Sequence, residues 1–195
     1  MKDYFNFFSL LLIFIILFCF ILMCMQSKMI LTGKATEVTT SSNVSVSKYL
    51  AIEFSNNLSS GIQFGTVNSL PATNINATGN YNGAANITTY YLNVSTDGNT
   101  DVNFCIKGNA ALTSAALDVI GLGNETYANA SSTTSTIPLI ENEVSLTSSY
   151  VKSSETIAVG GQNYYRFFLD IPVGQASGDY NNTLSFKGIQ VGTSC

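Results

Sequence analysis

The segment Ile87–Lys107, ITTYYLNVSTDGNTDVNFCIK, decides the fold class. Apolar side chains alternate with polar ones on each side of its Asp97-Gly98 pair, at Tyr90, Leu92, Val94, Val102, Phe104 and Ile106. This alternation is typical of β-strands that bury one face. Two such runs around an Asp-Gly pair predict a β-hairpin, and therefore an antiparallel sheet.

The same alternation continues outward from this segment in both directions. It recurs over residues 43–55, 61–67, 144–150, 164–171 and 180–191. Strands of this kind bury only one face each, so two sheets must pack together to cover it. The residues expected in the shared core are Leu92, Val94, Phe104, Phe167, Leu169, Leu184 and Phe186.

Two positions refine this prediction. Phe168 follows Phe167 and is expected on the opposite face, where its loss should cost less unless a second layer covers it. The apolar phase changes at Gly188, which predicts a β-bulge in the last strand. No long amphipathic helix alternates with the strands. The sequence therefore predicts an all-β fold, an antiparallel two-sheet sandwich that is immunoglobulin-like or jelly-roll-like, preceded by one N-terminal hydrophobic helix.

Residues 7–25, FFSLLLIFIILFCFILMCM, form an uncharged apolar run long enough for the ~30 Å hydrocarbon core of a bilayer. Two interpretations stay open. The run is either a membrane anchor or the apolar part of a signal segment, although signal segments usually have only ~7–15 apolar residues. The predicted domains are an anchor or signal segment (1–30), a linker, stalk or edge strand (31–42), and an extracellular sandwich (43–195).

The composition excludes several classes of function. The 195 residues include no histidine and carry a net charge of −4. Without histidine, Ser-His-Asp and Cys-His catalysis and most zinc and haem sites are excluded. Eight lysines and arginines on an acidic chain do not suit nucleic-acid binding. We therefore expect a protein that is not an enzyme, needs no cofactor and binds no nucleic acid.

The cysteines indicate the compartment. Cys19 and Cys24 lie in the apolar run, which leaves Cys105 and Cys195 to form a disulfide. This bond would require the last strand to run beside residues 101–107 or to end near them, and would stabilise the fold by roughly 4–5 kcal/mol in the chain-entropy model. An intermolecular disulfide and two free thiols are the alternatives. A disulfide favours an oxidising location.

Other candidate sites are surface features. Asp97, Asn99 and Asp101 have the spacing that begins many calcium loops, but a turn explains the same residues. The tyrosine pairs 90–91 and 164–165 offer rings for sugar stacking, although one tyrosine of each pair must face the core. N-x-S/T sequons, the acceptors of N-glycosylation, begin at Asn43, Asn57, Asn76, Asn86, Asn93, Asn124, Asn129 and Asn181.

The segment 171–186, IPVGQASGDYNNTLSF, resembles the closing hairpin of immunoglobulin-like surface and pilus-subunit domains of prokaryotes. The whole chain resembles small archaeal surface proteins that combine a leader with a sandwich. Some prokaryotic fibre subunits donate a strand to the next sandwich, so the resemblance implies contacts between copies. Cys195 departs from that pattern and favours a domain closed on itself.

The expected function is that of a structural or adhesive protein at the cell surface, either membrane-anchored or secreted, as a subunit of a surface layer or filament. Its expected partners are the membrane, through residues 7–25, and other surface proteins or copies of itself. The alternative function is a ligand-binding module for carbohydrate or calcium.

Overall fold

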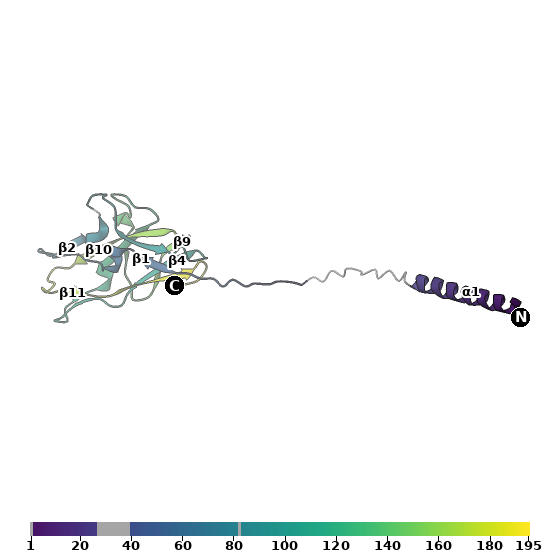
Figure 1. The fold of residues 1–195 in the computed structure, drawn as a ribbon. Coiled ribbons are helices and arrows are strands. Elements are labelled where there is room, and N and C mark those ends of the chain that lie inside the picture. The colour runs from purple at the N-terminus through teal and green to yellow at the C-terminus, as the bar shows by residue number, and fades with distance from the viewer. Residues whose placement is uncertain (1, 27–39, 82) are drawn as a thin grey trace. The chain divides into compact units, whose positions relative to one another are not determined.

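The computed structural model describes residues 2–26, 40–81 and 83–195, which fall into two units, Met1–Ser45 and Val46–Cys195 (Figure 1). The first unit contains helix α1 (Lys2–Gln26). The predicted N-terminal helix is therefore present and includes residues 7–25. Within the described part of the chain, no helix is both long and apolar enough to cross a membrane, so the membrane segment stays a prediction. Residues 27–39, which include most of the predicted linker, lie outside the described residues.

The second unit consists mainly of short strands. These are β1 (Ile52–Phe54), β2 (Ala72–Asn76), β3 (Tyr90–Val94), β4 (Val102–Gly108), β5 (Leu112–Ser114), β6 (Val119–Ile120), β7 (Glu125–Ala130), β8 (Val144–Ser145), β9 (Val151–Ile157), β10 (Gln162–Ile171), β11 (Tyr180–Asn181) and β12 (Leu184–Gln190). One short helix, α2 (Asn56–Ser59), and three 3-10 turns, η1 (Thr78–Asn80), η2 (Leu122–Asn124) and η3 (Ile140–Asn142), lie between them. Every strand pair is antiparallel, which confirms the predicted all-β class.

The strands form three sheets. Sheet A has the order β1-β3-β10-β7-β8, with β2 also paired to β10; sheet B has the order β12-β4-β9, and sheet C the order β11-β5-β6. Sheets A and B share one hydrophobic core, which includes Leu92, Val94, Tyr165 and Phe167 from sheet A and Val102, Phe104, Ile106 and Ile157 from sheet B. This shared core is consistent with the predicted sandwich.

The sequence prediction of the core is largely correct. Leu92, Val94, Phe104, Phe167 and Leu169 are buried. Leu184 and Phe186 are only half-buried, although they pack against the same core. Both belong to β12, which lies at the edge of sheet B and therefore has a neighbouring strand on one side only.

The hairpin predicted around Asp97-Gly98 is wrong. β3 pairs with β1 and β10 in sheet A, whereas β4 pairs with β12 and β9 in sheet B. The apolar faces of β3 and β4 therefore meet across the core instead of lying side by side in one sheet. The residues between the two strands form a crossover between sheets, because the local Asp-Gly signal is weaker than the requirement to bury both apolar faces.

The strand predicted over residues 43–55 is much shorter than expected. Only Ile52–Phe54 is a strand, and the side chains of Val44 and Val46 are 88% and 77% exposed. No strand forms over residues 61–67, but Ile62 and Phe64 pack against the core as predicted. Alternation thus identified Ile62 and Phe64 as inward side chains, but it was wrong for residues 43–47 and did not identify which segments have a hydrogen-bonded partner.

The last part of the chain differs from its prediction in two ways. Residues 171–186 do not form a closing hairpin, because β10 lies in sheet A and β12 in sheet B. The pairing of β12 with β4 continues through Gly188 without a register shift, so the predicted bulge is absent. A Cβ atom at Gly188 would lie 2.6 Å from the side chain of Ile52 and 3.0 Å from that of Val102. Close packing against these two side chains explains why a glycine occupies position 188.

The outer face of β10, where Phe168 was expected, is covered. The Phe168 side chain is only 2% exposed. Thr136, residues 139–141 and Tyr81 line the same small cavity as Phe168, above this face of the strand. A second layer therefore covers this face of β10, which is the exception that the sequence prediction allowed for Phe168.

Candidate functional site

The disulfide between Cys105 and Cys195 constrains the second unit most strongly. The two sulfur atoms are bonded and the Cα atoms lie 5.9 Å apart, within the ~4.4–6.8 Å range of disulfides. Cys105 lies in the middle of β4 and is fully buried, while Cys195 lies beyond β12. The predicted intramolecular disulfide is therefore confirmed.

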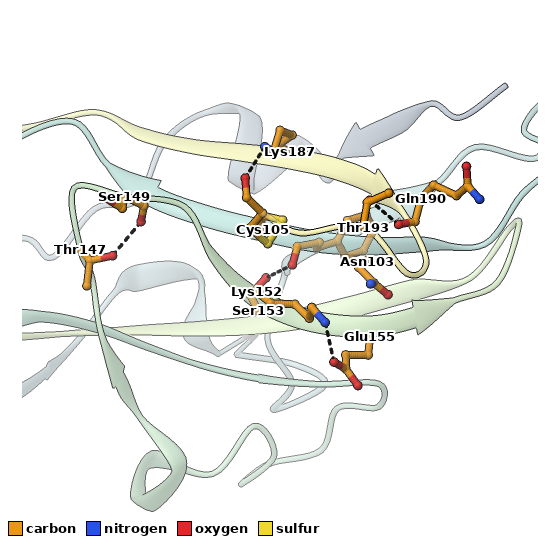
Figure 2. The surroundings of a disulfide bond; sticks show 12 residues. Asn103, Cys105, Thr147, Ser149, Lys152, Ser153, Glu155, Lys187, Gln190 and Thr193 are labelled. Carbon is orange, nitrogen blue, oxygen red and sulfur yellow. Dashed lines mark hydrogen bonds and ion pairs between the residues drawn. A yellow bond between two sulfur atoms is a disulfide. The ribbon is translucent and has the colours of Figure 1, made fainter. Parts of the chain in front are cut away.

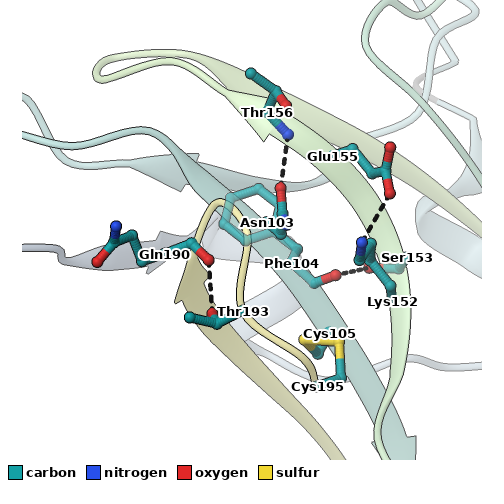
Figure 3. Close-up of polar contacts among 10 residues, drawn as sticks. All are labelled: Asn103, Phe104, Cys105, Lys152, Ser153, Glu155, Thr156, Gln190, Thr193 and Cys195. Atoms are coloured by element: carbon teal, nitrogen blue, oxygen red, sulfur yellow. Dashed lines mark hydrogen bonds and ion pairs between the residues drawn. A yellow bond between two sulfur atoms is a disulfide. The ribbon is translucent and has the colours of Figure 1, made fainter.

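The strand that precedes Cys195 pairs with the strand that holds Cys105. β12 runs antiparallel to β4 along its whole length, which confirms that the last strand lies beside residues 101–107. After β12 the chain turns back, and both the amide N–H and the hydroxyl of Thr193 donate hydrogen bonds to the Gln190 carbonyl (Figure 3). This turn brings Cys195 back to the middle of β4.

A lysine adds a polar contact at the same place. The Lys187 ammonium donates a hydrogen bond of 2.7 Å to the Cys195 carbonyl oxygen (Figure 2). It also lies 4.6 Å from the centre of the Tyr150 ring, and the Lys107 ammonium lies 4.7 Å from that centre. Two ammonium groups thus contact one aromatic ring. The end of the chain is held by a covalent bond, a hydrogen bond and the strand pairing.

Polar side chains join β4 to the strands around it. Asn103 accepts a hydrogen bond of 2.8 Å from the amide of Thr156, whose φ of +53° lies in the left-handed region (Figure 3). The Ser153 hydroxyl donates to the Phe104 carbonyl and is 2.8 Å from the Tyr165 hydroxyl. Ser153 belongs to sheet B and Tyr165 to sheet A, so this contact links the two sheets. Burial raises the pKa of Tyr165 to about 12.

In the predicted calcium loop, residues 97–101, the Asn99 side chain binds the main chain of a neighbouring segment. Asp97, Asn99 and Asp101 are all exposed. The Asn99 carboxamide accepts a hydrogen bond from the Tyr49 amide at 2.7 Å and donates one to the Ser47 carbonyl at 3.0 Å. In the part of the chain that is described, no three acidic, cysteine or histidine side chains gather closely enough to hold a metal. This loop therefore holds the segment that enters the domain.

The sequon asparagines differ in accessibility. Asn43, Asn57, Asn76, Asn86 and Asn181 are exposed, while Asn93, Asn124 and Asn129 are half-buried. Asn93 is the least suitable acceptor, because it lies in β3 with paired strands on both sides and its side-chain oxygen is buried. The exposed sequons have room for a glycan, and glycosylation itself stays a prediction.

The tyrosine pairs do not form an open platform for sugars. Tyr90 and Tyr165 are buried in the core. Tyr91 and Tyr164 are half-buried on the other face of sheet A, and their ring centres are 5.7 Å apart. The two rings therefore pack against each other across neighbouring strands. This packing accounts for both tyrosines without a sugar ligand.

The second unit has an open groove of about 1120 Å³. It is lined by residues 61–68, by residues 175–184 and by side chains of sheets A, B and C. Glu125 lies at its floor and is only 1% exposed. The Glu125 carboxylate accepts a hydrogen bond of 2.6 Å from the Asn182 amide. Burial raises the pKa of Glu125, and the bond from Asn182 partly opposes that shift.

Arg166 is the second buried charged residue. Its guanidinium donates hydrogen bonds to the carbonyls of Pro138 and Thr134 and lies over the Tyr81 ring at 4.6 Å. Its Nε atom is buried and has no hydrogen-bond partner in the described part of the chain. Burial lowers the pKa of Arg166. These contacts fix residues 134–138 against the outer face of β10, which is a structural role.

Sequence reasoning assigned no role to Glu125 or Arg166. Arg166 is the only arginine of the chain, which was a usable signal, but its position on the face of β10 opposite the core suggested exposure. Glu125 stands inside a sequon, where a polar side chain is expected at the surface. Burial of either residue depends on distant segments that local alternation does not report. Comparisons with protein families, curated proteins and solved structures found no match.

Proposed function

We propose that this chain is a non-catalytic structural or adhesive protein of the cell surface. The Cys105–Cys195 disulfide is the observation that carries the proposal. Disulfides persist in oxidising locations and are rare in the reducing cytosol. This disulfide is also part of the fold, because it attaches the end of the chain to a buried strand in the middle of sheet B.

The surface chemistry supports the same proposal. Only 10% of the residues are charged, so neutral polar groups must keep the domain soluble. Five of the sequon asparagines are exposed and have space for glycans, which would add solubility. Helix α1 would hold the chain at a membrane, either permanently or until a signal segment is removed.

The non-catalytic part of the proposal rests on the sequence. The chain has no histidine, and catalysis by nucleophile-histidine pairs is therefore excluded. The two buried charged residues have structural neighbours: Arg166 contacts main-chain carbonyls, and Glu125 contacts a carboxamide. A ligand-binding module is the second candidate, and the groove above Glu125 is the observation that favours it.

The experiment combines location with chemistry. Intact cells that make the protein are treated with a membrane-impermeant protease and, separately, with a membrane-impermeant thiol reagent before and after reduction. We expect the domain to be cleaved from intact cells and the two cysteines to react only after reduction. Mass spectrometry of the isolated chain then reads the N-terminus, the glycans and the disulfide. Reactive thiols on a protein protected from the protease would contradict the proposal.

A further inference from the structure

The groove of the second unit has an apolar floor. Leu112, Ile120 and Leu169 form a buried cluster there, and Phe64, Ile171 and Tyr180 pack against it. All six residues line the groove. At about 1120 Å³ the groove exceeds the ~300–1,000 Å³ of most small-molecule sites. It has room for several residues of a polypeptide.

The walls of this groove offer unpaired main chain. Among the described residues, no hydrogen bond involves the main chain of residues 64–70, which line one wall. On another wall β12 pairs with β4 on one side only, so its second edge has no strand partner in the described domain. Unpaired main-chain donors and acceptors beside an apolar floor are the features with which a sheet edge binds an extended peptide.

The charged residues that line the groove are all acidic. Glu125 and Asp179 are the only charged residues that line it, and both are acidic. Anionic ligands are therefore disfavoured. The Glu125 carboxylate has one carboxamide donor, from Asn182, in a buried position. A buried carboxylate gains most from a cationic partner that replaces the water it has lost.

We propose that this groove binds an extended polypeptide segment whose lysine or arginine side chain reaches Glu125. The apolar floor suits the methylene stem of such a side chain, and the ammonium or guanidinium group meets the carboxylate at its end. The neighbouring main chain pairs with residues 64–70 or with the free edge of β12. This inference goes beyond the proposed surface role and does not depend on where the chain is located.

A random library of nine-residue peptides, presented to the full-length chain in lipid nanodiscs, tests this proposal. We expect the enriched peptides to carry one lysine or arginine among alternating apolar residues. Glu125→Gln keeps the size of the side chain and should weaken binding of those peptides by about tenfold or more, because it removes one partner of a buried charge pair. Glu141→Gln is the matched control, since it removes an exposed carboxylate that lies outside the groove.

Each alternative occupant gives a different result. Enriched peptides without a basic residue, or peptides that bind Glu125→Gln as tightly as the natural chain, would overturn the proposal. So would a library from which no binding peptide is recovered. Binding of a neutral oligosaccharide that displaces the selected peptides would identify a carbohydrate site instead. Self-association of the chain that persists in Glu125→Gln would identify a second copy as the occupant, and would also overturn the proposal.

Discussion

Sheet B and the groove differ in strand pairing and in the burial of their side chains, although they share the strand β12. In sheet B the strands β12, β4 and β9 are paired, the core side chains of β4 are fully buried, and a disulfide holds the end of the chain. Beside the groove, residues 64–70 lack main-chain partners and a carboxylate is buried with a single carboxamide donor. Sheet B is held mainly by contacts within the chain, although the buried Ser154 hydroxyl has no hydrogen-bond partner among the described residues. The groove leaves main-chain groups of residues 64–70 without partners in the described domain.

This difference indicates how stability and recognition are divided. Fully paired and packed residues supply most of the free energy of unfolding, since buried apolar groups dominate it. A buried carboxylate with a single carboxamide donor costs free energy in the isolated domain. Residues 64–70 are mostly exposed, so water can bind their unpaired main-chain groups. The following experiments separate the two regions by measuring matched substitutions in each.

The largest difference is expected between two phenylalanines. Phe104→Ala removes a fully buried ring from sheet B and should lower the free energy of unfolding by about 3–5 kcal/mol. Phe54→Ala removes a ring at the groove that is 45% exposed, so its loss should be about 1 kcal/mol. Urea unfolding of both variants measures the losses. Equal losses would show that the groove contributes as much to stability as the core.

Loss of the disulfide is the next largest effect. Cys195→Ser should lower the free energy of unfolding by about 2–5 kcal/mol, because the bond closes a long loop in the unfolded chain. Amide hydrogen exchange should accelerate in β12 and stay unchanged in β7. Cys19→Ser is the control, since Cys19 is a free cysteine in α1. A Cys195→Ser variant as stable as the control would mean that strand pairing alone holds β12.

The two regions also differ in how far the sequence predicts them. Alternation identified five buried core residues correctly, because the period of two reports which side of a strand is apolar. The Cys105–Cys195 bond was predictable because only two cysteines lie outside the apolar helix. These signals are contained in short segments or in single residue types.

The partners of the strands were not predictable in the same way. The Asp-Gly turn at residues 97–98 suggested a hairpin, yet β3 and β4 lie in different sheets. The alternating residues 43–47 suggested a strand, yet Val44 and Val46 have no sheet to cover. Pairing depends on which distant segments arrive beside a strand. The groove and its buried Glu125 depend on the same long-range placement, and so the sequence did not reveal them.

A pair of glycines compares a tightly packed position in sheet B with an open position outside it. Gly188→Ala places a Cβ atom 2.6 Å from the side chain of Ile52 and should lower the free energy of unfolding by about 1–3 kcal/mol. Gly123→Ala, within η2, meets no atom within 4 Å and should change it by less than ~0.5 kcal/mol. Thermal unfolding compares the two variants. A neutral Gly188→Ala would show that β12 has space to move even in its paired half.

The smallest effect concerns the pH dependence of stability at Glu125. Burial raises the pKa of this carboxyl in the folded chain, so the folded state keeps the proton at pH values where the unfolded state has released it. The free energy of unfolding should therefore fall as pH rises from the ordinary carboxyl pKa through the raised one, and then become constant. Glu125→Gln lacks this proton, so its stability relative to the natural chain should be lowest near pH 4 and should increase toward pH 7. Urea unfolding across this range, with Glu141→Gln as the control for net charge, measures the difference. A difference that does not change with pH would mean that Glu125 is as well solvated as a surface carboxylate. The groove would then differ from sheet B in packing and main-chain pairing but not in the burial of a charge.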